Sequence, residues 1–328
     1  MPRETGTISV QTENIFPIIK KWLYSDKDIF IREMVSNAND AIVKLKKLIS
    51  LGEAKIAPDE KFYIKVIVNK DDKTIKIIDN GIGMTAEEVK KYINQIAFSG
   101  AVDFLEKYKD KSDESSQIIG HFGLGFYSAF MVSNKVTIDT LSWQEGAKAV
   151  KWTSTGGQEF EMDDSDLTER GTVVTLYLSE DSLGYLDYYK MKEILEKYCY
   201  FLPIELYLED ASKEAAKKKK ESEKEGRKEG PKPINDTHPL WLKNPKDCTE
   251  EEYREFYRKV FHDFKDPLFW IHLNMDYPFN LKGILYFPKL KHEYETIEGQ
   301  IKLYYNQVFV ADNIKEVIPE FLMLLKGV

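Results

Sequence analysis

The spacing of apolar and polar positions predicts a mixed helix-and-strand domain over residues 1–210. Apolar residues three and four positions apart predict helices near 13–24, 28–48, 85–96, 125–132 and 187–200. Alternating apolar positions predict strands near 62–68, 74–79, 135–141, 147–153 and 171–178. Several consecutive strands joined by short turns favour an antiparallel sheet. We therefore expect an α+β fold.

Residues 211–232 interrupt the pattern. They contain no large apolar side chain and carry nine basic and five acidic residues. Such a segment cannot bury enough surface to offset its ordering entropy, which predicts a charged flexible linker. A second domain follows over 233–328. Its pattern predicts a helix near 249–263, with Thr249 as N-cap, and strands near 269–275, 281–287 and 301–310.

Composition narrows the class of protein. A length of 328 residues fits two domains, and a net charge of −8 argues against nucleic acid as the main partner. Cys199 and Cys248 are too far apart to indicate a disulfide framework or a zinc site. The polar N-terminus and the lack of a long apolar run predict a cytoplasmic protein with no membrane segment.

A polar stripe lies on the helix predicted over 28–48. At helical spacing, Glu33, Asn37 and Asp40 fall on one side, beside a broad apolar surface. Two carboxylates and an amide with no lysine between them suit a water-activating base next to a hard-metal ligand. For this helix alone, a solvated face with a capping role is an equally good explanation.

A carboxylate ends the strand predicted over 74–79. Ile75 and Ile77 alternate, and Asp79 continues their parity, so Asp79 should lie on the apolar face. A carboxylate there is costly unless it finds donors, and an adenine amino group would supply one. Gly81 and Gly83 would let the backbone approach a flat ligand closely. The alternative is an ordinary Asp-Asn-Gly turn.

A glycine-rich turn at Gly120-His-Phe-Gly-Leu-Gly125 runs directly into an apolar helix. Free backbone N–H groups at such a helix start favour an anion such as phosphate. The spacing is neither that of the P-loop nor that of the dinucleotide fingerprint. A lone glycine turn is usually a connector, but three such elements in this order are hard to explain as connectors.

These three elements together resemble the ATP-binding motifs of the GHKL superfamily, which includes gyrase, MutL and histidine kinases. The fuller strings resemble the heat shock protein 90 chaperones, over nearly the whole chain outside the linker. The strings are Ile29-Phe-Ile-Arg-Glu-Met-Val-Ser-Asn-Ala, Ile96-Ala-Phe-Ser-Gly100, Ile119-Gly-His-Phe-Gly-Leu-Gly-Phe-Tyr-Ser128, Arg170-Gly-Thr-Val-Val-Thr-Leu-Tyr177 and Pro319-Glu-Phe-Leu-Met-Leu-Leu-Lys-Gly-Val328. The short linker and the absence of a signal peptide are similar to the bacterial branch of that family.

The resemblance implies a two-layer α/β sandwich of GHKL type, with a mostly antiparallel sheet covered by helices, followed by the first part of an α/β middle domain. It also implies an ATP-dependent chaperone and ATPase whose hydrolysis cycle drives a dimeric clamp on client proteins. Another GHKL machine, of the kinase or DNA-repair and topoisomerase type, is the alternative. A kinase would need a phosphoacceptor-histidine domain, and the DNA machines would favour a basic second domain.

Site roles follow from the same resemblance. Glu33 would be the general base, and Asn37 would bind Mg²⁺ through its amide oxygen. Asp79 would accept a hydrogen bond from adenine N6, helped by Thr172. The remaining contacts to ATP or ADP would come from Gly83 and Met84 in the adenine pocket, from Ser99, Gly100, Gly120, Phe122, Gly123, Gly125 and Phe126 in the lid and phosphate cradle, and from Asp40 and Lys44 near the phosphates.

The chain departs from the family pattern at two positions. Many relatives have Asn at the position of Tyr92, where it contacts the ribose region, and Lys at the position of Phe98, where it contacts the phosphates. The chain lacks the two side chains that make these contacts in many relatives, and Asn94 is a candidate substitute. The resemblance also implies residues after Val328, among them an arginine for the γ-phosphate and a dimerisation domain. We therefore expect a truncated, mainly monomeric form that binds ADP and ATP but is nearly inactive in hydrolysis.

Overall fold

The computed structural model describes residues 26–95, 100–108, 118–120, 123–157, 159–213, 231–275, 281–289, 300–312 and 325–328. These residues fall into two compact units. The first runs to Glu196 and takes up the chain again from Ile204 to Ile234. The second holds Lys197–Pro203 and the described residues from Asn235 onward.

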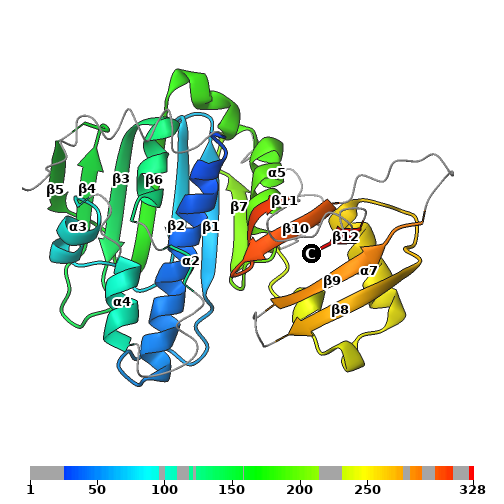
Figure 1. Ribbon diagram of the computed structural model, residues 1–328. Helices are drawn as coiled ribbons and strands as arrows, with labels where there is room; N and C mark the ends of the chain where they lie inside the picture. The colour runs from blue at the N-terminus through cyan, green and yellow to red at the C-terminus, as the bar shows by residue number, and fades with distance from the viewer. Residues whose placement is uncertain are drawn as a thin grey trace, which may run out of the picture. The chain divides into compact units, whose positions relative to one another are not determined.

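A seven-stranded sheet forms the first unit (Figure 1), in the order β5-β4-β3-β6-β2-β1-β7. Each neighbouring pair is antiparallel except β1 and β7, which are parallel. This agrees with the expected mostly antiparallel sheet. The strands are β1 (Tyr63–Asn69), β2 (Thr74–Asp79), β3 (Ser133–Leu141), β4 (Val150–Ser154), β5 (Phe160–Asp164), β6 (Gly171–Leu178) and β7 (Glu205–Asp210).

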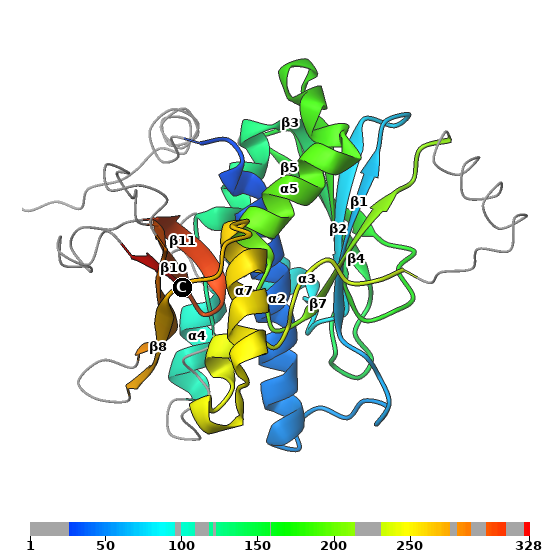
Figure 2. The same ribbon diagram turned by 90° about the vertical axis from the view of Figure 1, so that its right-hand side faces the viewer.

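Helices cover one face of this sheet. Figure 2 shows α2 and α5 on the same side of the strands. Helix α2 buries an apolar stripe here, since Ile31, Val35, Ile42 and Leu45 are fully buried. The helical segments of the unit are α2 (Ile29–Ser50), α3 (Ala86–Tyr92), α4 (Gly100–Tyr108), α5 (Tyr188–Cys199) and the 3-10 segments η4 (Gly125–Met131) and η5 (Glu180–Leu186).

Among its described residues, the second unit has a smaller sheet and one long helix. Its strand order is β11-β10-β12-β9-β8. Thr249 caps the helix as the sequence predicts, since its hydroxyl accepts from the Glu252 N–H and the Glu252 carboxylate accepts from the Thr249 N–H. The elements are the 3-10 turns η6 (Leu240–Leu242) and η7 (Pro245–Asp247), helix α7 (Glu250–Phe261), and strands β8 (Phe269–Met275), β9 (Leu281–Phe287), β10 (Gln300–Tyr305), β11 (Val308–Asp312) and β12 (Lys326–Gly327).

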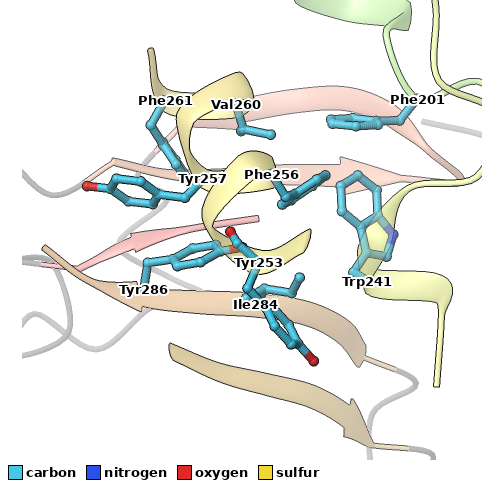
Figure 3. Packing of buried hydrophobic residues seen from close by; sticks show 9 residues of the cluster. All are labelled: Phe201, Trp241, Tyr253, Phe256, Tyr257, Val260, Phe261, Ile284 and Tyr286. Atoms are coloured by element: carbon cyan, nitrogen blue, oxygen red, sulfur yellow. The ribbon is translucent and has the colours of Figure 1, made fainter. Parts of the chain in front are cut away.

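Aromatic side chains dominate the core of the second unit. Figure 3 shows the residues of α7 gathered with Phe201, Trp241 and Tyr286. The rings of Phe201 and Trp241 meet edge to face, with centroids 4.4 Å apart. The buried Tyr286 hydroxyl donates to the Tyr253 carbonyl at 3.0 Å, so burial of this ring leaves its polar atom satisfied.

Most predicted elements are confirmed, and the exceptions have local causes. The strand predicted over 301–310 is wrong as a single element: Asn306 and Gln307 have positive φ angles of 47° and 65° and turn the chain back, so that β10 and β11 pair antiparallel. Residues 125–131 form a 3-10 segment instead of an α-helix. The sequence reading did not predict α4, β5 or β7. The predicted helix 13–24 and most of the charged segment 211–232 lie outside the described residues.

Candidate functional site

Helix α2 presents the predicted polar stripe to the glycine-rich segment, whose described residues are 119, 120 and 123–125. Both Nε and Nη2 of Arg32 donate to Oε1 of Glu33, at 3.0 and 2.6 Å. The other oxygen, Oε2, lies against Gly125, where a Cβ atom would collide with it. A side chain at position 125 would therefore displace the Glu33 carboxylate from this place.

The same stripe holds a second part of the glycine-rich segment. The carboxylate of Asp40 accepts from the backbone N–H of Ile119 at 2.9 Å and of Gly120 at 2.7 Å. A Cβ on Gly120 would lie 3.1 Å from Asp40 Oδ2 and 3.6 Å from Asn37 Oδ1. Asn37 itself is exposed. Helix α2 and the described residues 119–120 and 123–125, which are far apart in the sequence, therefore meet along Glu33, Asn37 and Asp40.

Burial and neighbouring charges shift the pKa values of Asp40 and Lys44 in opposite directions. Burial raises the pKa of Asp40, and the two backbone N–H groups and Lys44 act in the opposite direction. Burial lowers the pKa of Lys44, opposed by the carboxylates of Asp40, Glu88 and Asp103. The predicted site residues Asp40 and Lys44 therefore form one electrostatically coupled group beside the glycine-rich segment.

Asp79 ends β2 on the buried face, as its parity with Ile75 and Ile77 predicts. Its Oδ1 accepts from the Gly81 N–H at 2.8 Å. In the antiparallel register Asp79 pairs with Thr172 of β6, which places the predicted helper residue directly across from it. Burial raises the pKa of Asp79 to about 7, against the opposing effects of the Gly81 N–H and the charge of Arg170.

The hydroxyl of Thr140 connects this turn to the sheet. It accepts from the Met84 N–H, donates to the Gly171 carbonyl and contacts the Thr172 hydroxyl, each at 3.0 Å. Gly83 has a φ of 62°, and a Cβ there would collide with the Leu141 carbonyl. Sequence reasoning missed Thr140; its only signal is a polar residue at an inward position of β3.

The turn after Asp79 also packs on helix α2. The Ile82 N–H donates to the Ala41 carbonyl at 3.1 Å, and a Cβ on Gly81 would lie 2.6 Å from the carbonyl carbon of Ala41. Ala41 directly follows Asp40, so the Asp79 turn and the glycine-rich segment both meet α2. The structure therefore brings the three predicted motifs together on one helix.

The other predicted site residues make contacts within the protein. Asn94 Oδ1 accepts from the Trp152 indole at 2.9 Å. Asn94, the candidate substitute for the missing nucleotide contacts, is therefore bonded to a residue of β4. Phe126 is buried and meets Trp152 edge to face, with centroids 5.7 Å apart. Gly123 has a φ of 63° and lies in the glycine-rich segment. Ser99 and Phe122 lie outside the described residues.

Tyr92, one of the two departures from the family pattern, joins helices α3 and α4. A Cβ on Gly100 would lie 3.2 Å from the Tyr92 ring, and the Tyr92 hydroxyl donates to Asp103 at 3.2 Å. Lys91 also pairs with Asp103. Tyr92 therefore fixes the start of α4, where the predicted site residue Gly100 lies. The second departure, Phe98, falls outside the described residues.

Comparison with known families first defines the class of the first unit. Residues 27–170 match the family described as "Histidine kinase-, DNA gyrase B-, and HSP90-like ATPase". The match includes α2, the Asp79 turn and the glycine-rich segment. The first unit therefore has the fold of a GHKL-type ATPase domain, as the sequence motifs predict.

Residues 203–328 match the family described as "Hsp90 protein". The chain is 51% identical over 325 residues to the chaperone protein HtpG of Bacteroides thetaiotaomicron, covering 99% of this chain and 46% of the relative. It is 49% identical to HtpG of Porphyromonas gingivalis, over 98% of this chain and 46% of the relative. HtpG of Fusobacterium nucleatum is 35% identical, over 100% of this chain and 51% of the relative. The chain belongs to the heat shock protein 90 family, and it spans about half the length of these curated relatives.

The described residues show neither a membrane-spanning helix nor a metal-binding cluster. None of their helices has the length and apolar character needed to cross a lipid bilayer. Within the same residues, no three His, Cys, Asp or Glu side chains gather as a metal-binding group.

Proposed function

We propose that this chain is the nucleotide-binding part of an ATP-dependent chaperone, followed by the first part of its middle domain. The observation that carries the proposal is Asp79, a buried carboxylate at a strand end beside a glycine turn and across from Thr172. Asp79 binds the adenine amino group, Gly83 and Met84 line the adenine, and the glycine-rich segment holds the phosphates. Domain limits of 1–210, 211–232 and 233–328 remain part of the proposal.

Each residue of the polar stripe on α2 has one task in ATP hydrolysis. Glu33 accepts the proton of the attacking water and orients it toward the γ-phosphate. Asn37 is exposed and its amide oxygen faces the glycine-rich segment, which fits a ligand of Mg²⁺. When bound, Mg²⁺ supplies charge neutralisation at the phosphates. Asp40 holds Ile119 and Gly120 in place beside them.

The cellular role follows the family. In the full-length dimer, the hydrolysis cycle acts on unfolded or partly folded client proteins in the cytoplasm. The alternative of a kinase or a DNA-repair or topoisomerase ATPase is less favoured, because residues 203–328 match the Hsp90 family and the net charge is −8. A surface on the second unit fits client contact, since Phe269 and Ile271 of β8 are 50% and 43% exposed.

We expect the 328-residue chain to bind ADP and to discriminate against GDP by about 10²-fold or more. Guanine presents a carbonyl oxygen where adenine presents its amino group, so the Asp79 carboxylate would face a second acceptor with no proton between them. Calorimetric titration with each Mg²⁺-nucleotide measures the difference. Equal affinities would exclude the adenine-specific site and leave only a phosphate-binding function.

We expect ADP affinity to rise with pH and to level off above about pH 7. The pKa of Asp79 is raised to about 7 in the folded chain, and the ionised carboxylate is the stronger acceptor for the adenine amino group. Below that pKa the site must lose a proton on binding, so affinity falls by up to about tenfold per pH unit. Calorimetry at saturating Mg²⁺, which keeps the ADP phosphates ionised, tests this between about pH 5.5 and 8.5.

Folding stability is expected to follow the opposite trend. The pKa of Asp79 in the folded chain lies above its unfolded value of 3.8. The stability that Asp79 contributes to the fold is therefore fully present below the unfolded pKa and is lost as pH rises through about 7. Binding and stability should therefore change in opposite directions across this range. An ADP affinity that is flat from acid to neutral pH would contradict the assignment of Asp79.

A further inference from the structure

One side chain from a distant part of the sequence holds the turn that follows Asp79. Arg170, the residue before β6, donates from Nε to the Gly81 carbonyl at 2.9 Å and from Nη2 to the Asn80 carbonyl at 2.8 Å. The planar guanidinium thus engages two successive backbone carbonyls at once. A lysine, with a single ammonium, lacks this fork geometry.

Arg170 is itself held in place by a carboxylate. Its Nη2 pairs with Glu60, and the two side chains are only 17% and 29% exposed. The Asn80 side chain donates to the Lys61 carbonyl at 2.9 Å and accepts from the Tyr63 N–H at 3.0 Å. The turn is therefore fixed from two sides, by residues 60–63 and by Arg170.

The backbone next to Arg170 packs directly against the turn, with no room for a side chain at position 171. Gly171 has a φ of 132°, and a Cβ there would collide with the Asp79 carbonyl oxygen and lie 2.9 Å from the Asn80 Cα. Small movements of Arg170 would therefore be transmitted directly to the backbone of Asp79.

Arg170 also acts on Asp79 through its charge. Within the described part of the chain, Arg170 is the charged side chain that lowers the pKa of Asp79 against the effect of burial. Arg170 is in turn ion-paired with Glu60. Loss of the guanidinium would raise that pKa further, and binding would then require a higher pH. This effect distinguishes a role in ligand recognition from a merely structural one.

We propose that Arg170 is a positioning residue for adenine recognition, which holds the Asn80 and Gly81 carbonyls so that Asp79 presents its carboxylate to the base. The proposal rests on the function proposed above for Asp79. Arg170 touches neither the base nor the phosphates in this role. It acts on binding through the turn and through the charge of Asp79.

The test compares Arg170→Met and Arg170→Lys with the parent 328-residue chain in Mg²⁺-ADP calorimetry across pH. Arg170→Met should bind ADP about tenfold more weakly at neutral pH, and the midpoint of its pH profile should move upward. Arg170→Lys keeps the charge but loses the fork, so it should weaken binding while its midpoint stays near that of the parent. Arg258→Met, which removes an ion-paired arginine from α7, should change neither.

Thermal unfolding of each variant separates loss of fold from loss of recognition. If Arg170→Met does not fold, Arg170→Lys decides, and parent affinity in that variant overturns the proposal. A folded Arg170→Met with parent affinity and an unshifted midpoint also overturns it. Asp79→Asn separates a failure of the proposed function from a failure of the Arg170 proposal. If Asp79→Asn binds ADP normally, the proposed function is wrong. If Asp79→Asn abolishes binding and the Arg170 variants do not weaken it, only the role of Arg170 is wrong.

Discussion

Asp79→Asn is expected to abolish measurable binding of ADP and ATP, with a loss of about 100-fold in affinity. A hydrogen bond to a charged acceptor contributes about 1.5–3 kcal/mol, and an amide can turn its NH₂ group toward the adenine amino group. The fold should survive, because burial already disfavours the ionised Asp79 and its pKa is raised to about 7. An uncharged amide therefore removes a cost of folding.

Calorimetry with both nucleotides measures this effect, and thermal unfolding verifies that the variant is folded. Asp163→Asn makes the same change on the exposed strand β5 and should bind like the parent chain. An Asp79→Asn variant that is folded and binds ADP with near-parent affinity would refute the adenine assignment. It would leave only the contacts proposed for the phosphates.

The parts of the site that lie within one element could be predicted from the sequence. The parity of Ile75, Ile77 and Asp79 placed the carboxylate on the buried face, and the structure confirms it. The stripe on α2 follows from helical spacing in the same way. Patterns of this kind are predictable because side-chain direction in a strand or helix depends on the local backbone alone.

The contacts that hold those parts together could not be predicted. Arg170 and Glu60 are 110 residues apart, and Thr140 and Thr172 are 32 apart. Each pair forms only when the strands adopt their order in the sheet, and no local pattern marks that order. The family resemblance included Arg170 in a string but assigned it no contact with the turn after Asp79.

Asp40 illustrates a different limit. Sequence reasoning placed it near the phosphates and expected free backbone N–H groups in the glycine-rich turn. In the structure its carboxylate accepts from the N–H groups of Ile119 and Gly120, so an anion of the protein itself engages two of these donors. Donors and acceptors could be listed from the sequence, but their pairing depends on how residues 118–120 lie on α2.

Glu33→Ala is expected to leave nucleotide affinity within a few-fold of the parent while lowering ATP hydrolysis by about 10²–10⁴-fold. The carboxylate lies beside the glycine-rich segment, with Oε2 against Gly125 and Oε1 held by Arg32. Its removal takes away the acceptor for the water proton but none of the contacts proposed for adenine. Binding and turnover should therefore separate in this variant, unlike in Asp79→Asn, where both are lost together.

Steady-state hydrolysis by a chain of the length of the curated relatives measures this effect, with ADP calorimetry on the same variant. Glu87→Ala, on the exposed side of α3, removes the same charge away from the site and should hydrolyse ATP like the parent. Glu33→Gln keeps the size of the side chain but is a far weaker base, so it should be nearly as slow as Glu33→Ala. If Glu33→Gln turned over at the parent rate, the carboxylate would only position the water, and another group would have to accept its proton.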